Sequence, residues 1–240
     1  MRAVRLHQNG LRLEELAMPE PREGEALVRV HAAAITRDEL TWPADRLPAI
    51  PSYELSGTVE ATGEPVFALT PFDRDGVAAE YAVVPSALLA PKPTKLSHVE
   101  AAALPMGALS AWQALIVHGG LRAGERVCIT GAAGNVGQLA AQLARARGAT
   151  LVAEGEPCDL LFDTSGRAAG EATRIVTIAE ETPGADYFIV EPNGEQLVEL
   201  SHLQLRPEID SVFPLTAFAS AFERVGARGK HGKVVLDVTG

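Results

Sequence analysis

The segment 131–137 has the residue types and spacing of a phosphate-binding turn. A short apolar run at 125–130 stops at this Gly/Ala-rich segment, which opens directly into a helical pattern. The backbone N–H groups of such a turn, together with the N-terminus of the helix, can approach a pyrophosphate. The three glycine positions of G-x-G-x-x-G are taken, in order, by Ala132, Gly134 and Gly137. The pattern predicts dinucleotide binding, and close strand–helix packing without a ligand is the alternative interpretation.

A second residue that could contact a dinucleotide is Glu154, twenty positions after Gly134 and at the end of the next apolar run. An acid at this point hydrogen-bonds the ribose 2′-OH of NAD and repels a 2′-phosphate. Glu156 lies close by, so a solvated acidic loop is the alternative interpretation.

Composition excludes several classes of protein. The chain has 240 residues, of which 47% are hydrophobic and 22% charged, so a sizeable core is expected. A net charge of −10 argues against nucleic acid or an anionic membrane as the main partner. Two cysteines, Cys128 and Cys158, cannot form a four-thiolate zinc site. The sequence has no signal-peptide pattern and no apolar run long enough for a bilayer, so we expect a cytoplasmic protein.

The elements that must position the turn begin with strands. The first ninety residues contain short apolar runs bounded by glycine, proline or charged turns, and apolar and polar residues alternate clearly at 27–31. This pattern indicates an antiparallel, partly barrel-like β unit. The expected strands are 3–6, 11–16, 26–33, 55–61, 65–69 and 80–84.

Helices alternate with buried strands over the rest of the chain. Ser97 and Glu100 form a capping box that starts a helix, and Pro105 is expected to stop it. The helix after the glycine turn carries apolar residues at helical spacing. Further helices are expected at 110–118, 195–203 and 215–225, and strands at 150–153, 160–162, 175–178, 187–190, 209–213 and 233–238.

Several motifs occur in the order found in a known family. They are the opening segment 1–4, the segments 24–30, 48–57, 100–105 and 109–112, the glycine turn, and the segments 163–166 and 232–236. This ordered set resembles the medium-chain dehydrogenase/reductase superfamily, in its zinc-free quinone oxidoreductase and enoyl reductase branch. The resemblance implies a GroES-like antiparallel β domain, 1–105 and 206–240, with an inserted, truncated Rossmann-type parallel sheet at 106–205. It also implies reduction of quinones or activated alkenes with NADPH.

The zinc-dependent branch of the same superfamily is disfavoured. Its cysteine ligand would fall near Thr36 and its histidine ligand at Tyr53, and neither threonine nor tyrosine is a good zinc ligand. The six histidines are scattered without a pair at useful spacing. We therefore expect no metal.

The resemblance further implies where the coenzyme lies. Thr36 aligns with a position that touches the nicotinamide ribose, and Ser110, which we expect to open a helix, aligns with one that contacts the phosphate or nicotinamide end. The turn at Gly166 and the strand 188–190 match places where backbone meets the nicotinamide. The alternatives are a surface polar residue, a helix N-cap and sheet core, respectively. The predicted contacts are Thr36, Ser110, Gly131, Ala132, Gly134, Asn135, Val136, Gly137, Glu154, Ser165, Gly166, Phe188 and Val190.

Tyr53 is the candidate acid. After hydride delivery to an enone or quinone, an enolate or phenolate needs a proton, which a phenol could donate. The alternative is an aromatic packing residue in the β domain, and placement of coenzyme and substrate could suffice without any acid. Glu54 resembles a structural position of the family.

The chain is too short for a full dinucleotide domain. After the strand at 150–153 only four residues, 154–157, precede the run at 158–163, which matches the family's fourth strand. A parallel crossover needs a dozen or more residues, and four residues span at most about 14 Å. We therefore expect the strand at 150–153 to pair differently, for example antiparallel, or the helix before it to take a distorted path. The third strand and its helices, which normally hold the adenosine, are expected to be absent.

Two classes of function follow. The first is a shortened, zinc-independent reductase that binds NADPH or NADH weakly and acts on a small-molecule substrate, with a homodimer as an assembly consistent with the family. The second is a degenerate, non-redox member that binds or cyclises a small molecule without coenzyme, or acts as a scaffold. A third interpretation, a poorly folded product of internal deletion, would be contradicted by cooperative melting.

Overall fold

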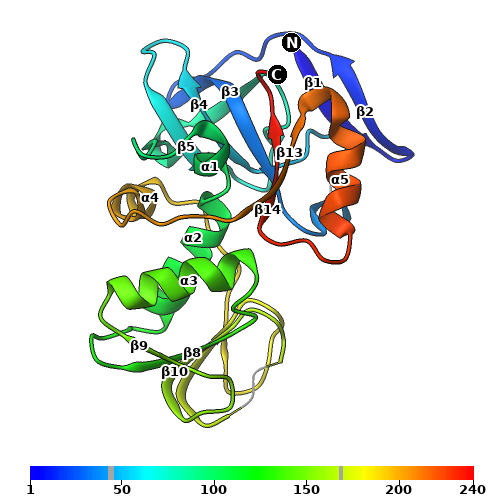
Figure 1. Ribbon diagram of the computed structural model, residues 1–240. Coiled ribbons are helices and arrows are strands. Elements are labelled where there is room, and N and C mark those ends of the chain that lie inside the picture. The colour runs from blue at the N-terminus through cyan, green and yellow to red at the C-terminus, as the bar shows by residue number, and fades with distance from the viewer. Residues whose placement is uncertain (43–45, 168–169) are drawn as a thin grey trace. The chain divides into compact units, whose positions relative to one another are not determined.

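Two sheets of different type organise the chain (Figure 1). The computed structural model describes residues 1–42, 46–167 and 170–240. Unit 1 comprises Met1–Pro105, Pro192–Gln204 and Glu208–Gly240, and unit 2 comprises Met106–Glu191 and Leu205–Pro207. Among the described residues, no helix has the length and apolar character needed to cross a membrane.

Unit 1 is built on a seven-stranded sheet in the order β13-β14-β3-β4-β5-β7, with β6 paired to β3. All of its pairings are antiparallel except β13 with β14. A separate hairpin of β1 and β2 completes the unit. The strands are β1 (Arg2–His7), β2 (Gly10–Glu15), β3 (Glu25–Ile35), β4 (Glu54–Val59), β5 (Pro65–Leu69), β6 (Tyr81–Pro85), β7 (Ala90–Pro91), β13 (Ile209–Pro214) and β14 (Lys233–Asp237).

Short helices cover this sheet. The predicted capping box is confirmed, because Ser97 Oγ accepts the N–H of Glu100 while the Glu100 carboxylate accepts the N–H of Ser97. The helices are η1 (Glu39–Thr41), η2 (Ser86–Leu88), α1 (His98–Ala102), α4 (Gly194–Ser201), η4 (Leu215–Ala217) and α5 (Phe218–Gly226). Small and β-branched residues of β3 and β14 form the core beneath them.

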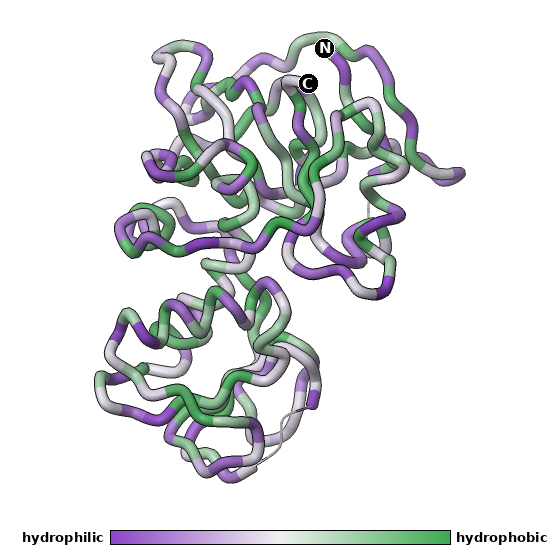
Figure 2. The backbone as a smooth tube through the Cα atoms, viewed as in Figure 1, coloured by the Kyte–Doolittle hydropathy of each residue, from purple (hydrophilic) through white to green (hydrophobic). Residues whose placement is uncertain are grey.

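Unit 2 holds a five-stranded sheet, β12-β11-β10-β8-β9, in which every pairing is parallel. Figure 2 shows hydrophobic residues concentrated on its central strands. Its strands are β8 (Arg126–Thr130), β9 (Thr150–Val152), β10 (Cys158–Asp163), β11 (Ala172–Thr177) and β12 (Asp186–Tyr187), and its helices are α2 (Pro105–Trp112, whose first residue closes unit 1), the π-helix η3 (Gln113–His118) and α3 (Asn135–Ala146). The predicted combination of an antiparallel sheet with a truncated parallel sheet is confirmed.

The expected pairing of the strand at 150–153 is wrong. β9 pairs parallel with β8 on one side, and β10 pairs parallel with β8 on the other. The connection from β9 to β10 is possible because β9 has only three residues. The chain has to run back along the length of β9, about 10 Å, and pass across β8 to reach β10, about another 10 Å. The six steps from Val152 to Cys158 can reach about 20 Å. The connection passes beside Cys128, whose Sγ lies 3.7 Å from the carbonyl oxygen of Ala153.

The shortening itself is as expected. Only the described residues 153–157 separate β9 from β10, and they form turns, so no third strand or helix stands there. β9 is therefore the edge of the sheet.

Three element boundaries differ from the prediction. Pro105 does not stop a helix but begins α2, because proline lacks the N–H that a first helical residue leaves unused. The helix at 194–201, which we placed in the cofactor domain, packs in unit 1: Gly194 approaches the carbonyl of Ala87 so closely that a Cβ would lie 2.2 Å from it. The strand expected at 187–190 ends at Tyr187.

Candidate active site

The glycine turn between β8 and α3 presents backbone N–H groups without a side-chain cap. Gly131 has a positive φ of 66°, which favours glycine, and Gly134 is the N-cap of α3 with no side-chain hydrogen bond to the helix. A Cβ on Gly134 would lie 3.3 Å from the carbonyl oxygen of Gly131, a tight contact that a small shift of that carbonyl would relieve. An uncapped helix start with a glycine at the N-cap is suited to an anion.

Gly137 serves the packing of the same turn. A Cβ on Gly137 would lie 2.5 Å from the Gly131 carbonyl oxygen and 2.7 Å from Ala132 Cα, and both are backbone atoms. The helix therefore approaches the turn more closely than any side chain allows. Of the turn glycines, Gly131 and Gly137 are required by the fold itself, whereas Gly134 faces fewer atoms.

The side chain of Asn135 lies against α2. Its amide nitrogen and oxygen are both buried and have no hydrogen-bond partner among the described residues. The side chain packs against α2, where a Cβ on Gly107 would lie 2.4 Å from the Asn135 amide nitrogen. The backbone of Asn135 lies at the first position of α3, and contact of this residue with the coenzyme stays a prediction.

Glu154 lies beside the glycine turn, as its spacing predicted. Its carboxylate accepts the N–H of Gly131 at 3.2 Å. Arg174, which could have supplied a cation for a 2′-phosphate, instead binds the Glu125 carboxylate at 2.8 Å and the Gly119 carbonyl at 2.7 Å. The Glu154 carboxylate thus lies at the turn, while the Arg174 guanidinium is bonded elsewhere in unit 2.

Asp163 organises the turn at 163–166. No sequence pattern singled it out as a site residue. It is buried, and its Oδ1 accepts the hydroxyl of Thr130 and the N–H groups of Ser165 and Gly166 at 3.0 and 3.1 Å. Burial alone raises the pKa of Asp163, but the hydrogen bonds from Thr130 and Ser165 hold it below its ordinary value. We call Asp163 with these hydrogen bonds the Asp163 hub. It links the end of β8 to the predicted contacts Ser165 and Gly166.

Ser110 does not open a helix. It lies inside α2, is 3% exposed, and its hydroxyl donates to the Met106 carbonyl at 2.7 Å. The N-cap alternative is therefore wrong, and the proline at the start of α2 explains why. Contact of Ser110 with the coenzyme stays a prediction.

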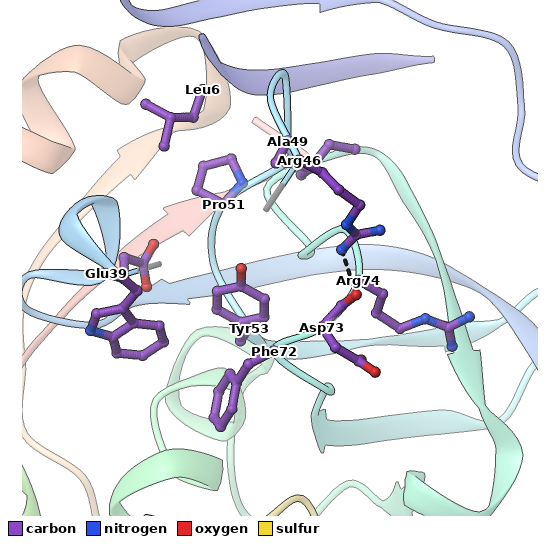
Figure 3. A pocket seen from close by; sticks show the side chains of 11 residues that line it. Leu6, Glu39, Arg46, Ala49, Pro51, Tyr53, Phe72, Asp73 and Arg74 are labelled. Carbon is purple, nitrogen blue, oxygen red and sulfur yellow. Dashed lines mark hydrogen bonds between the residues drawn. The ribbon is translucent and has the colours of Figure 1, made fainter. Parts of the chain in front are cut away.

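Unit 1 contains an aromatic pocket of about 90 Å³ that includes Tyr53 (Figure 3). Trp42 stacks on Tyr53 with ring centroids 5.8 Å apart, and Phe72 meets Tyr53 edge-on at 5.3 Å. Burial, followed by the charge of Glu39, raises the pKa of Tyr53 above its ordinary value. The phenol therefore keeps its proton over the neutral range. Its ring makes the packing contacts that the alternative interpretation expects, and its role as an acid stays a prediction.

Glu39 is a second functional candidate that the sequence did not reveal. It lines the same pocket and is 6% exposed, and its two carboxylate oxygens accept the N–H groups of Thr36 and Ser52 at 2.8 and 3.0 Å. It thereby joins the loop after β3 to the segment before β4. Burial raises the pKa of Glu39 to about 8.

We expect Glu39 to make the stability of the protein fall as the pH rises. The folded-state pKa of about 8 exceeds the ordinary value of 4.5, so between these values unfolding releases a proton and becomes more favourable. In Glu39→Gln this component is absent. The free energy of unfolding of Glu39→Gln, relative to the parent, should therefore be higher at pH 8 than at pH 5, measured by urea denaturation. An unchanged difference between the two pH values would contradict the assignment.

The position of the absent zinc ligand is occupied by a buried ion pair. The hydroxyl of Thr36 donates to Glu54 Oε1 at 3.1 Å, and the Lys233 ammonium donates to Thr36 Oγ1 at 2.9 Å and to Glu54. The side chains of Lys233 and Glu54 are 7% and 0% exposed. Among the described residues, no group of three or more His, Cys, Asp or Glu side chains is placed to hold a metal ion. These residues do not fit a catalytic zinc, since a fixed ammonium repels a divalent cation and no thiolate or imidazole replaces it.

The predicted residues therefore gather in two groups. In unit 1, Thr36 and Tyr53 are joined through Glu39 and Ser52. In unit 2, the glycine turn, Glu154 and the Asp163 hub surround the end of β8. Phe188, 8% exposed, donates its N–H to the Thr177 carbonyl at the end of β11.

Comparisons with known proteins give one family. A family described as zinc-binding dehydrogenase matches residues 128–236. A probable zinc-binding oxidoreductase, mitochondrial, of Arthroderma benhamiae is 29% identical over 308 aligned positions, covering 95% of this chain and 93% of that protein. Because this chain has 240 residues, at least 68 of those positions have no counterpart in it.

Two quinone oxidoreductases are also similar. The protein of Pongo abelii is 34% identical over 166 residues, which cover 62% of this chain and 50% of that protein, so the match spans half of the relative. The quinone oxidoreductase of Thermus thermophilus, whose structure was also determined with NADPH, is 29% identical, with a TM-score of 0.82 over 99% of this chain and 100% of that one. With the ordered motifs and the two sheets, these likenesses establish that the chain belongs to the medium-chain dehydrogenase/reductase superfamily, a family of oxidoreductases.

Proposed function

We propose that the protein is a zinc-independent, NAD(P)H-dependent reductase of quinones or activated alkenes. The observation that carries the proposal is the glycine turn at the end of β8. Gly134 is the N-cap of α3 there and supplies no side-chain hydrogen bond to the helix, and the hydrogen bonds of Asp163 lie beside the turn. The names of the similar proteins, quinone oxidoreductase and 2-methylene-furan-3-one reductase, support the substrate class.

The chain's own residues suit a dinucleotide. The N–H groups that begin α3 would face the pyrophosphate, and Thr36, Ser110, Ser165, Gly166 and the segment 188–190 are the proposed contacts of the nicotinamide half. When bound, NADPH or NADH would supply a hydride to the electrophilic carbon of the substrate.

Zinc independence rests on the residues around Thr36. The Lys233 ammonium already neutralises Glu54 there, and threonine and tyrosine stand where the zinc-dependent branch has its ligands. Metal analysis of the purified protein tests this part: activity that survives chelation, with less than one zinc per ten chains, is the expected result.

Tyr53 would donate the proton that the reduced substrate needs. Its ring is held by Trp42 and Phe72, and it is the phenol that lines the aromatic pocket, where a flat conjugated substrate can pack against the rings.

Replacement of Tyr53 by phenylalanine should lower turnover of enones by up to about 10²-fold and leave coenzyme affinity unchanged, because only the hydroxyl is lost. Steady-state kinetics and coenzyme titration measure the two effects. Phe72→Leu, a change in the same pocket that removes no proton, serves as control. Equal kinetics of Tyr53→Phe and the parent would leave Tyr53 as a packing residue only.

The shortened sheet predicts weak coenzyme binding with little preference. The turns at 153–157 replace the part of the fold that normally holds the adenosine, and Glu154 offers no cation for a 2′-phosphate. Dissociation constants for NADH and NADPH should lie within about tenfold, or about 1.4 kcal/mol, of each other. Calorimetric titration with both coenzymes is the measurement, and a stronger preference for NADPH would contradict this account of the edge at β9.

The same missing part favours the second candidate, a non-redox member that binds or cyclises a small molecule without coenzyme. Tight binding of either coenzyme would exclude it, while absence of hydride transfer with every quinone and enone tried would exclude the first candidate. A small molecule as the partner, rather than nucleic acid or membrane, accords with the net charge of −10. A homodimer and a cytoplasmic location stay predictions.

A further inference from the structure

The helix before β8 widens from α to π geometry at Gln113. In η3 the N–H of Gly119 donates to the Ala114 carbonyl at 2.8 Å, an i→i+5 bond. Residues five apart in an α-helix lie about 140° apart around the axis, whereas i→i+5 bonding brings them closer to the same side. The widened turn therefore places Gln113 and His118 on the same side of the helix.

Both of these side chains hold the strip 186–191. The Gln113 amide donates to the Glu191 carbonyl at 2.8 Å and accepts the Glu191 N–H at 2.9 Å. His118 Nδ1 lies 2.9 Å from Asp186 Oδ2, and its ring stacks on Phe188 with centroids 4.4 Å apart at 18°. Gln113 is 6% exposed, so its two bonds are shielded from water.

Among the residues that the structure describes, the other strands of the sheet hold this strip only at its first residues. β12 ends at Tyr187, and the last backbone bond to β11 runs from the Phe188 N–H to the Thr177 carbonyl at 3.2 Å. Ile189 is 68% exposed. The path of the backbone from 188 to 191 thus depends on a side-chain clamp at its far end.

We propose that Gln113 is a positioning residue for hydride transfer, whose amide clamp on Glu191 fixes the backbone at 188–190 against the nicotinamide. The inference rests on the proposed function, since the role of the strip comes from the proposed contacts Phe188 and Val190. Gln113 touches neither substrate nor reacting atoms; it acts through the strip.

Gln113→Glu is the direct test, because it keeps the size of the side chain and the acceptor for the Glu191 N–H. It replaces the donor to the Glu191 carbonyl by a second acceptor, so one bond becomes a repulsion. Gln142→Glu is the matched control: Gln142 makes the same pair of bonds to Arg206, at 2.9 and 2.9 Å, on a segment without proposed coenzyme contacts.

We expect Gln113→Glu to slow single-turnover hydride transfer about tenfold or more, with the dissociation constant of NADPH within about twofold of the parent because the glycine turn is untouched. The rate should recover as the pH falls toward 5, since protonation of the new carboxyl restores a donor to the Glu191 carbonyl. Gln142→Glu should change neither the rate nor its pH profile. His118→Ala removes the other contact of the strip and should also slow hydride transfer. Because the His118 side chain is 29% exposed, this variant provides the test if Gln113→Glu does not fold.

Equal rates and pH profiles in Gln113→Glu and Gln142→Glu would overturn this inference and leave the proposed function standing. Absence of hydride transfer in the parent would overturn the proposed function itself.

Discussion

Replacing Lys233 by methionine should lower the free energy of unfolding by about 3–5 kcal/mol, the largest stability loss we expect from a single change in unit 1. The ammonium and the Glu54 carboxylate are almost wholly buried, and the Lys233 side chain also bonds the hydroxyl of Thr36. Removing the cation leaves a carboxylate in the interior without it, and burial of such a charge is costly. Urea denaturation followed by tryptophan fluorescence measures the loss.

Two further variants show whether the pairing is the cause. Lys233→Met combined with Glu54→Leu removes both charges and should recover most of the loss, because a pair of apolar residues can replace a buried ion pair with little net effect. Arg126 and Glu156 form an ion pair in which the side chains are 48% and 53% exposed. Arg126→Met breaks this exposed pair and should lower the free energy of unfolding by less than about 1 kcal/mol. A loss for Lys233→Met no larger than this control would refute the argument.

Gly134→Val should weaken coenzyme binding by about a hundredfold or more, close to 2.7 kcal/mol, with little change in the thermal midpoint. A branched side chain would stand over the N–H groups that begin α3, where the pyrophosphate is proposed to lie. The fold tolerates more at this position than at Gly137, because the nearest atom to a new Cβ is 3.3 Å away rather than 2.5 Å.

The comparison that separates binding from folding is Gly226→Val at the end of α5, where a new Cβ meets no atom within 4 Å. Coenzyme titration should show the parent affinity for this control. If Gly134→Val also keeps the parent affinity, the glycine turn serves only strand–helix packing.

Local patterns predicted the elements that local forces determine. The capping box at Ser97, the apolar face of α3 and the glycine turn each depend on residues within a few positions of one another. The prediction that Pro105 stops a helix was wrong, because proline both ends helices and is favoured at their first position. The local sequence does not decide between these two roles.

Residues joined over long distances in the sequence escaped prediction. Glu39, Asp163 and Lys233 each bond at least one group that lies far away in the sequence, and no local spacing indicates such a partner. The parallel pairing of β9 was missed for a related reason. The strand has three residues rather than the four expected at 150–153, and its length sets the distance that the connection has to cover.

The short connection after β9 also has a consequence for the kinetics of folding. Val127 of β8 pairs with Leu160 of β10, so the central pair of the parallel sheet closes a loop of 33 residues. Reinserting a strand with its helices would roughly double that loop and cost about 0.6 kcal/mol of closure entropy. Since folding rates fall as contacting residues become more distant in sequence, the sheet of unit 2 should refold faster than that of a full-length relative.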